Sequence, residues 1–131
     1  MVAIDTSGSI GDEALSYFIG HMQHLCDTIN PDGVDIVWWG TSVVGVDEFT
    51  RGSLNNLASA VKPIGGGGTD PSCIPAWMKK EQREYVCAVV VTDGEFGNDV
   101  GQWNIPVLWL VVNNGDIANI PIGKVVHIKE I

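Results

Sequence analysis

Residues 2–10 read VAIDTSGSI, and the fold prediction starts from this stretch. Three apolar residues are typical of a short buried strand, and polar residues follow at every second position. Asp5, Ser7 and Ser9 point the same way if the chain leaves the strand still extended, because alternate residues of an extended chain share a face. One carboxylate and two hydroxyls would then face a common point.

Two more oxygen-rich loops follow apolar segments later in the chain. Residues 65–70 read GGGGTD and residues 92–95 read TDGE. We expect the three loops to meet above one sheet and to hold a hard divalent cation without His or thiol ligands. Mg²⁺ favours six oxygens at about 2.0 to 2.1 Å and leaves places for water or an incoming ligand. Because hydroxyls leave the cation much of its charge, such a site recruits an anionic oxygen from elsewhere.

The three loops resemble the von Willebrand factor type A (VWA) family. Its metal-ion-dependent adhesion site (MIDAS) is written DxSxS, followed by a distant Thr and a distant Asp. All five positions are matched in order, by Asp5, Ser7, Ser9, Thr69 and Asp93. The resemblance covers essentially the whole sequence. It implies that these five residues hold Mg²⁺, with Mn²⁺ and Ca²⁺ as alternatives.

The four-glycine loop and the late segments IPVLWLVV and IPIGKVVHI look most like a bacterial and phage subgroup of intracellular VWA-like domains. In that subgroup the domain often follows a metallopeptidase-like segment, which this sequence lacks. We therefore expect a minimal phage-type protein or a domain cut from a longer chain. The resemblance implies a protein partner that presents Asp or Glu to the metal. It also implies that an AAA+ ATPase is one class of partner.

The composition indicates one globular domain over residues 1–131. A chain of 131 residues with 45% hydrophobic content is long enough to bury one core and too short for two. Sixteen acidic and seven basic residues give a net charge of −9, which argues against nucleic acid and against docking on an anionic membrane. The longest apolar stretch, residues 105–112, is too short to span a membrane.

Three cysteines indicate the cellular compartment. Cys26, Cys73 and Cys87 form no CxxC pair and lie in apolar segments, which predicts reduced, buried thiols rather than a disulfide. No basic leader precedes the first strand. Both observations favour a cytoplasmic protein.

The apolar patterns alternate between strand and helix, which predicts an α/β fold with a doubly wound, mostly parallel central sheet, flanking helices and one antiparallel edge strand. We expect strands at residues 2–4, 34–40, 43–49, 85–92, 107–112 and 125–128. We expect helices at residues 12–29, 53–61 and 71–83. Compared with longer VWA members, the link from residue 93 to 106 is short, so its helix is expected to be one turn or missing.

The first predicted helix has apolar residues at three- and four-residue steps along one face. They are Leu15, Phe18, Ile19, Met22, Leu25, Cys26 and Ile29. This face is expected to pack on the sheet. In open α/β sheets ligands bind beyond the carboxyl ends of the strands, where Asp5 and Asp93 are expected.

Each candidate residue also has a simpler structural interpretation. Asp5, Ser7 and Ser9 fit a helix-capping turn, and the glycine loop fits a flexible linker or a phosphate cradle, although the GK[ST] ending of a nucleotide loop is missing. Asp70 and Glu95 are interpreted as solvated loop acids, not as ligands.

Histidine and tryptophan residues were weighed in the same way. His21 and His24 form HxxH on the first helix, but no Glu or Cys stands at a zinc-site spacing, so a partly exposed helix surface is expected. The tryptophans are expected mostly in the core, with Trp77 and Trp103 as alternative rim residues of a binding surface.

Two functions from different classes fit the sequence. The first is a metal-dependent protein-binding module without enzymatic activity. The second is a metal-dependent hydrolase or phosphoryl-transfer enzyme that uses the same cation to activate water. The second lacks a base or nucleophile, because no HExxH, GxSxG or DxDxT-like pair is found. The sequence therefore favours the binding module.

Overall fold

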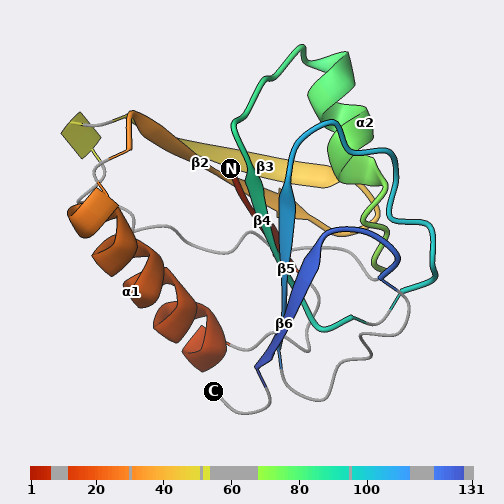
Figure 1. Cartoon of the computed structure of the whole chain (residues 1–131), viewed down its shortest axis with the longest axis horizontal. Helices are drawn as coiled ribbons and strands as arrows, with labels where there is room; N and C mark the ends of the chain where they lie inside the picture. The colour runs from red at the N-terminus through yellow and green to blue at the C-terminus, as the bar shows by residue number, and fades with distance from the viewer. Residues whose placement is uncertain are drawn as a thin grey trace.

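A six-stranded sheet in the order β3-β2-β1-β4-β5-β6 organises the chain in the computed structural model (Figure 1). The structure describes residues 1–6, 12–29, 31–50, 52–53, 68–94, 96–112 and 120–128. The strands are β1 (Val2–Asp5), β2 (Gly33–Trp39), β3 (Val43–Thr50), β4 (Ala88–Thr92), β5 (Val107–Val112) and β6 (Lys124–Ile128). All neighbouring pairs are parallel except β2 and β3. The predicted mostly parallel sheet with one antiparallel edge strand is confirmed.

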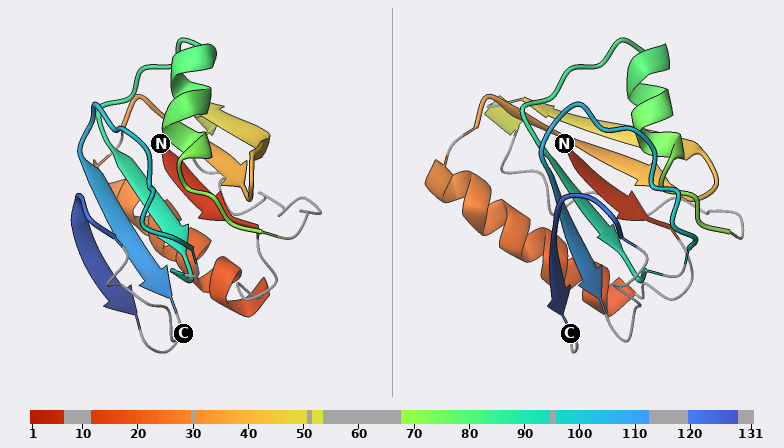
Figure 2. Two further views of the ribbon diagram at one scale, coloured as in Figure 1. Left: turned by 90° about the vertical axis from the view of Figure 1, so that its right-hand side faces the viewer. Right: turned by 45° about the vertical axis from the view of Figure 1, so that its right-hand side comes forward.

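Two helices cover opposite faces of this sheet (Figure 2). The first, α1 (Asp12–Ile29), has the predicted bounds, and its residues Leu15, Phe18 and Ile19 are buried in one core cluster with Val2 and Ile4. The second, α2 (Cys73–Lys80), buries Ile74 in another core cluster on the opposite face of the sheet. There it packs with strand residues such as Ala3 and Val37, whose neighbours along the strands belong to the first cluster. A two-layer core of this kind explains why the central strands are apolar on both faces. The side chains of Leu25, Cys26 and Ile29 are outside the described residues.

Helix α2 is shorter than the predicted helix over residues 71–83. Pro71 lies in the turn before the helix, and the last helical residue is Lys80. Gln82 has a positive φ of 54°, and the N–H groups of Gln82 and Arg83 donate to the carbonyls of Lys79 and Met78 at 3.3 and 2.8 Å. This left-handed cap satisfies the last carbonyls and turns the chain away from the helix axis. The predicted end at Arg83 is therefore wrong by three residues.

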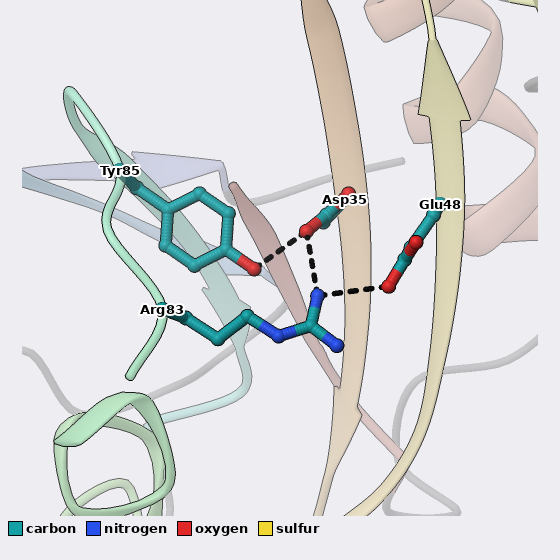
Figure 3. Close-up of polar contacts among 4 residues, drawn as sticks. All are labelled: Asp35, Glu48, Arg83 and Tyr85. Atoms are coloured by element: carbon teal, nitrogen blue, oxygen red, sulfur yellow. Dashed lines mark hydrogen bonds and ion pairs between the residues drawn. The ribbon is translucent and has the colours of Figure 1, made fainter. Parts of the chain in front are cut away.

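The segment between α2 and β4 is held by polar contacts instead of strand pairing (Figure 3). The Arg83 guanidinium donates from Nη1 to Asp35 Oδ2 at 3.3 Å and to Glu48 Oε1 at 2.9 Å. The Tyr85 hydroxyl donates to Asp35 Oδ2 at 2.6 Å. These contacts tie the segment to the start of β2, and β4 begins only at Ala88. The predicted strand start at residue 85 is wrong for this reason.

The remaining predictions have mixed outcomes. The predicted strands over residues 34–40, 43–49 and 125–128 match β2, β3 and β6 to within one residue at each end. The predicted helix over residues 53–61 lies outside the described residues except for Ser53. No helix is present in residues 96–106, as expected for the short link. In the described part of the chain, no helix is both long and apolar enough to cross a membrane.

Three tryptophans fill the core, as predicted. Trp38, Trp39 and Trp109 are at most 1% exposed. Trp77 and Trp103 pack against the α2-side core cluster. Trp77 also lies under Arg83, whose Cζ is 5.2 Å from the ring centroid, and is thus near the start of β2. The interpretation of Trp77 and Trp103 as rim residues of a binding surface stays a prediction.

Candidate metal site

The carboxyl ends of β1 and β4 bring two of the predicted ligands to the same edge of the sheet. Asp5 is the last residue of β1, and Asp93 directly follows β4. The two strands are parallel neighbours, with Ile4 opposite Val91, so Asp5 is level with the end of β4. From β1 the sheet grows toward β2 on one side and β4 on the other, which makes this edge the switch point where open α/β sheets bind ligands.

Both aspartates are buried, and the Thr92 hydroxyl connects the end of β1 with the turn after β4. Asp5 is 0% exposed and Asp93 is 4% exposed. The Thr92 hydroxyl donates to Asp5 Oδ2 at 2.9 Å and accepts the Gly94 N–H at 3.2 Å. A buried carboxylate is costly unless it is hydrogen-bonded, paired or bound to a metal, so Thr92 lowers the cost of keeping Asp5 inside.

The loop that carries Thr69 docks on the end of β2, next to β1. The Asp70 N–H donates to the Gly40 carbonyl at 2.8 Å. A Cβ at Gly40 would lie 3.4 Å from both the Gly68 carbonyl and Thr6 Oγ1, so the loop and the end of β1 approach closely here. Gly68 has a φ of +96°, a conformation open mainly to glycine. Thr69 is half-buried at the edge that also carries the two aspartates.

Three of the five predicted ligands, Asp5, Thr69 and Asp93, are described and lie at the carboxyl edge of the sheet. Ser7 and Ser9 lie outside the described residues, as does Glu95. Within the described residues, no group of three or more His, Cys, Asp and Glu side chains is placed to hold a metal. The predicted site contains only two carboxylates. Its other ligands are Ser and Thr hydroxyls, so it would not form a group of three His, Cys, Asp or Glu side chains. Its donor set is oxygen alone, which fits Mg²⁺.

Asp70 and His24 lie as their simpler interpretations predicted. Asp70 is exposed and accepts hydrogen bonds from Ser72 N–H at 3.1 Å and Ser72 Oγ at 2.6 Å. These contacts stabilise the turn before α2, as Asp commonly does. His24 is exposed on α1, and the side chain of His21 is not described.

A thiol lies beside the same edge. Cys73 is half-buried, and its Sγ is 3.9 Å from the Gly40 carbonyl. Burial raises the pKa of Cys73 to about 12, and the charges of Asp70 and then Asp5 add to the rise. Cys87 is exposed, so the prediction of buried thiols is wrong for this residue. Cys73 and Cys87 are both free thiols, as predicted.

Sequence reasoning missed Thr92 and Thr6 as residues of this edge. The Thr6 N–H and hydroxyl both donate to the Trp39 carbonyl, at 2.8 and 3.0 Å, which fixes the chain as it leaves β1. A buried Thr at the end of an apolar strand is the available signal in the sequence. Its partner becomes visible only when the strands are paired.

The strand order and the edge on which these residues meet define a VWA-like α/β domain. A family model described as "VWA-like domain (DUF2201)" matches residues 1–129. The chain therefore belongs to the DUF2201 family of VWA-like domains.

Two solved structures have a similar fold. One is an aerotolerance-related membrane protein from Bacteroides fragilis with multiple mutations to serines, at a TM-score of 0.62 and 18% identity over 85% of this chain. The other is the conserved hypothetical protein BatB from Bacteroides thetaiotaomicron, at a TM-score of 0.60 and 18% identity over 86% of this chain. The match covers 65% of each of those chains. A comparison with curated proteins finds no match.

Proposed function

We propose that this domain is a protein-binding module whose divalent cation accepts a carboxylate from a partner protein. In this proposal Ser7, Ser9 and Thr69 bind the cation directly, and Asp5 and Asp93 bind it directly or through water. A bound cation supplies an electrophilic centre for an Asp or Glu oxygen of the partner. Mg²⁺ is the proposed ion, with Mn²⁺ and Ca²⁺ as alternatives.

The observation that carries the proposal is the burial of Asp5 and Asp93 at adjacent strand ends, together with the docking of the Thr69 loop at the same edge. Membership in a VWA-like family supports an interaction role. Hydroxyl ligands leave more charge on the cation than carboxylates would, and that charge favours binding of an external anionic oxygen. An AAA+ ATPase, as part of a cytoplasmic system that includes a metallopeptidase-like segment, is the proposed type of partner.

The experiment is calorimetric titration of the chelator-treated protein with Mg²⁺, Mn²⁺ and Ca²⁺. We expect saturable binding of one ion, which is lost in Asp5→Asn and in Asp93→Asn. Asp70→Asn is the matched control, because Asp70 is an exposed acid that accepts hydrogen bonds from Ser72 and is not a proposed ligand. Binding that persists in both site variants would remove the proposed site.

The same samples test whether the site is catalytic. With bound metal, a generic phosphate ester such as p-nitrophenyl phosphate should not be turned over, because the proposal assigns no base or nucleophile. Sustained turnover that disappears in Asp93→Asn while the circular dichroism spectrum persists would favour the hydrolase or phosphoryl-transfer alternative over the binding module.

A further inference from the structure

A groove with a cavity volume of about 1070 Å³ runs along α2, on the side facing residues 102–105. We call it the α2 groove. The helix side is formed by residues three and four apart, among them Ala76 and Lys79, and the opposite wall includes Trp103 and Ile105. The groove exists because the link between β4 and β5 covers this face without a helix in residues 96–106. A cavity of this size holds several side chains of a bound peptide.

The link and α2 are in close contact at one end of the groove, which fixes its two walls. Gly101 has a φ of +84°, and a Cβ there would lie 2.6 Å from Pro75 Cγ and 3.1 Å from Ser72 Cα. Only glycine permits this approach without a shift of the helix or the link. The Trp103 indole N–H donates to the Val100 carbonyl at 2.7 Å, and its ring meets Trp109 edge-on. The aromatic wall is therefore held in place before any partner arrives.

The charge of the α2 groove is opposite to that of the molecule. Lys79, Lys80 and Arg83 are three of the seven basic residues in a chain with a net charge of −9. Lys79 and Arg83 line the groove, while Glu84 is its one acidic lining residue. Across the described parts of the chain, Lys79 and Lys80 take part in no ion pair. Lysines in a last helical turn also favour the helix dipole, but that role does not account for the groove beside them.

Arg83 lines the groove and is held by polar contacts, which Figure 3 shows. Its Nη1 contacts Asp35 and Glu48, and its guanidinium lies over Trp77. Both ion-pair contacts use the same nitrogen, and the side chain lines the groove and is 32% exposed, so a partner's carboxylate can reach the guanidinium. A guanidinium that is already ordered loses little conformational entropy when it binds a carboxylate.

We propose that the α2 groove binds an acidic segment of a partner protein that carries an apolar anchor. The carboxylates contact Lys79 and Arg83, and the anchor lies against Trp103 and Ile105. This surface is separate from the cation site: it requires no metal, and a chelator leaves it intact. The excess of acids elsewhere on the domain repels such a segment, so the groove is where charge complementarity directs it.

The test starts with a random peptide library displayed on phage and selected against the full 131-residue chain in EDTA. We expect enriched peptides that combine Asp or Glu with an aromatic or aliphatic residue. One enriched peptide is then synthesised with a fluorophore, and its affinity is measured by fluorescence polarisation in EDTA. Failure to enrich any peptide, or enrichment of peptides without acids, would overturn the proposal.

Matched variants decide whether that peptide occupies the groove. Lys79→Glu should weaken binding about tenfold, as expected when an attractive charge becomes a repulsive one. Lys124→Glu makes the same charge change on the exposed strand β6 and should leave the affinity unchanged. Ala76→Gln should weaken binding several-fold by placing a longer neutral side chain on the helix wall, and Glu84→Gln should strengthen it. Equal losses in the two lysine variants, or no loss in Ala76→Gln, would place the peptide elsewhere and refute the assignment.

Discussion

The acidic residues at the two edges of the parallel sheet have different hydrogen-bond partners. At the amino edge, where the parallel strands begin, Asp35 and Glu48 lie directly opposite each other on β2 and β3. Like charges in that position destabilise a sheet, and Arg83 offsets them by contacting both. Glu48 in turn raises the pKa of Arg83 through their hydrogen bond. Arg83 thus offsets part of the negative charge of this edge within the chain.

At the carboxyl edge, where the parallel strands end, Asp5 and Asp93 are more deeply buried than the acids of the amino edge. Asp5 Oδ2 accepts a hydrogen bond from the neutral hydroxyl of Thr92. A hydroxyl orients a carboxylate without neutralising its charge, whereas a guanidinium does both. The hydrogen bond from Thr92 therefore leaves the negative charge of Asp5 in place.

The largest expected effect concerns one thiol at each edge, Cys73 at the carboxyl edge and Cys87 at the amino edge. In a Cys26→Ser background at pH 8, a thiol reagent should modify Cys73 about a hundredfold more slowly than Cys87, because the thiolate is the reactive species and burial suppresses it. The raised pKa of Cys73, about 12, means that its rate should increase as the pH rises toward that value. Modification of each residue is followed with the Cys73→Ser and Cys87→Ser variants. Equal rates at both sites would contradict the geometry of the carboxyl edge.

The next effect is the stabilisation of the carboxyl edge by metal. At a free Mg²⁺ concentration of a hundred times Kd, a ligand that binds only the folded state stabilises it by about 2.7 kcal/mol. Ser7→Ala combined with Ser9→Ala should remove most of this gain, while the metal-free protein stays folded because its core rests on the sheet and helices. Chemical denaturation with and without Mg²⁺ measures the difference. Unfolding of the wild-type protein on chelation would show that the core depends on the site.

Thr92→Val tests the hydroxyl support of Asp5. It should cost about 2 kcal/mol of stability, because it removes the hydroxyl that donates to the buried Asp5 carboxylate. It should also weaken Mg²⁺ binding, since Asp5 is no longer oriented. Thr92→Ser keeps the hydroxyl and should recover most of both losses. If Val and Ser variants bind Mg²⁺ equally, Thr92 contributes packing alone.

The smallest expected effect is at the amino edge. Tyr85→Phe removes the hydroxyl that donates to Asp35 and should cost about 1 kcal/mol in a urea melt. Because Arg83 still neutralises Asp35, Mg²⁺ binding should not change. The Tyr85 hydroxyl has a raised pKa, mainly through burial, so it remains a donor throughout the neutral range. A change in metal affinity would show that the two edges are coupled.

The periodicity of the sequence was sufficient for the elements that are regular and packed on both sides. The bounds of α1 and β5 were predicted without error because their apolar spacing continues to the last residue of each element. The end of α2 was not predictable in this way, since Gln82 adopts a left-handed conformation that usually belongs to glycine. The start of β4 was missed because Arg83 and Tyr85 contact residues about fifty positions earlier in the chain.

By itself, the sequence determined the fold class and the two-sided core, because periodicity is a local property of the chain, and its resemblance to the VWA family gave the five oxygen-bearing residues of the candidate site as a prediction. Only the tertiary structure decided that Asp5 and Asp93 end neighbouring strands, that Thr92 supports Asp5, and that Arg83 joins Asp35 and Glu48. The α2 groove also belongs to the tertiary structure, since its walls come from segments that meet only when the link to β5 folds over α2. Contacts between distant residues depend on strand pairing and packing, which no local pattern encodes.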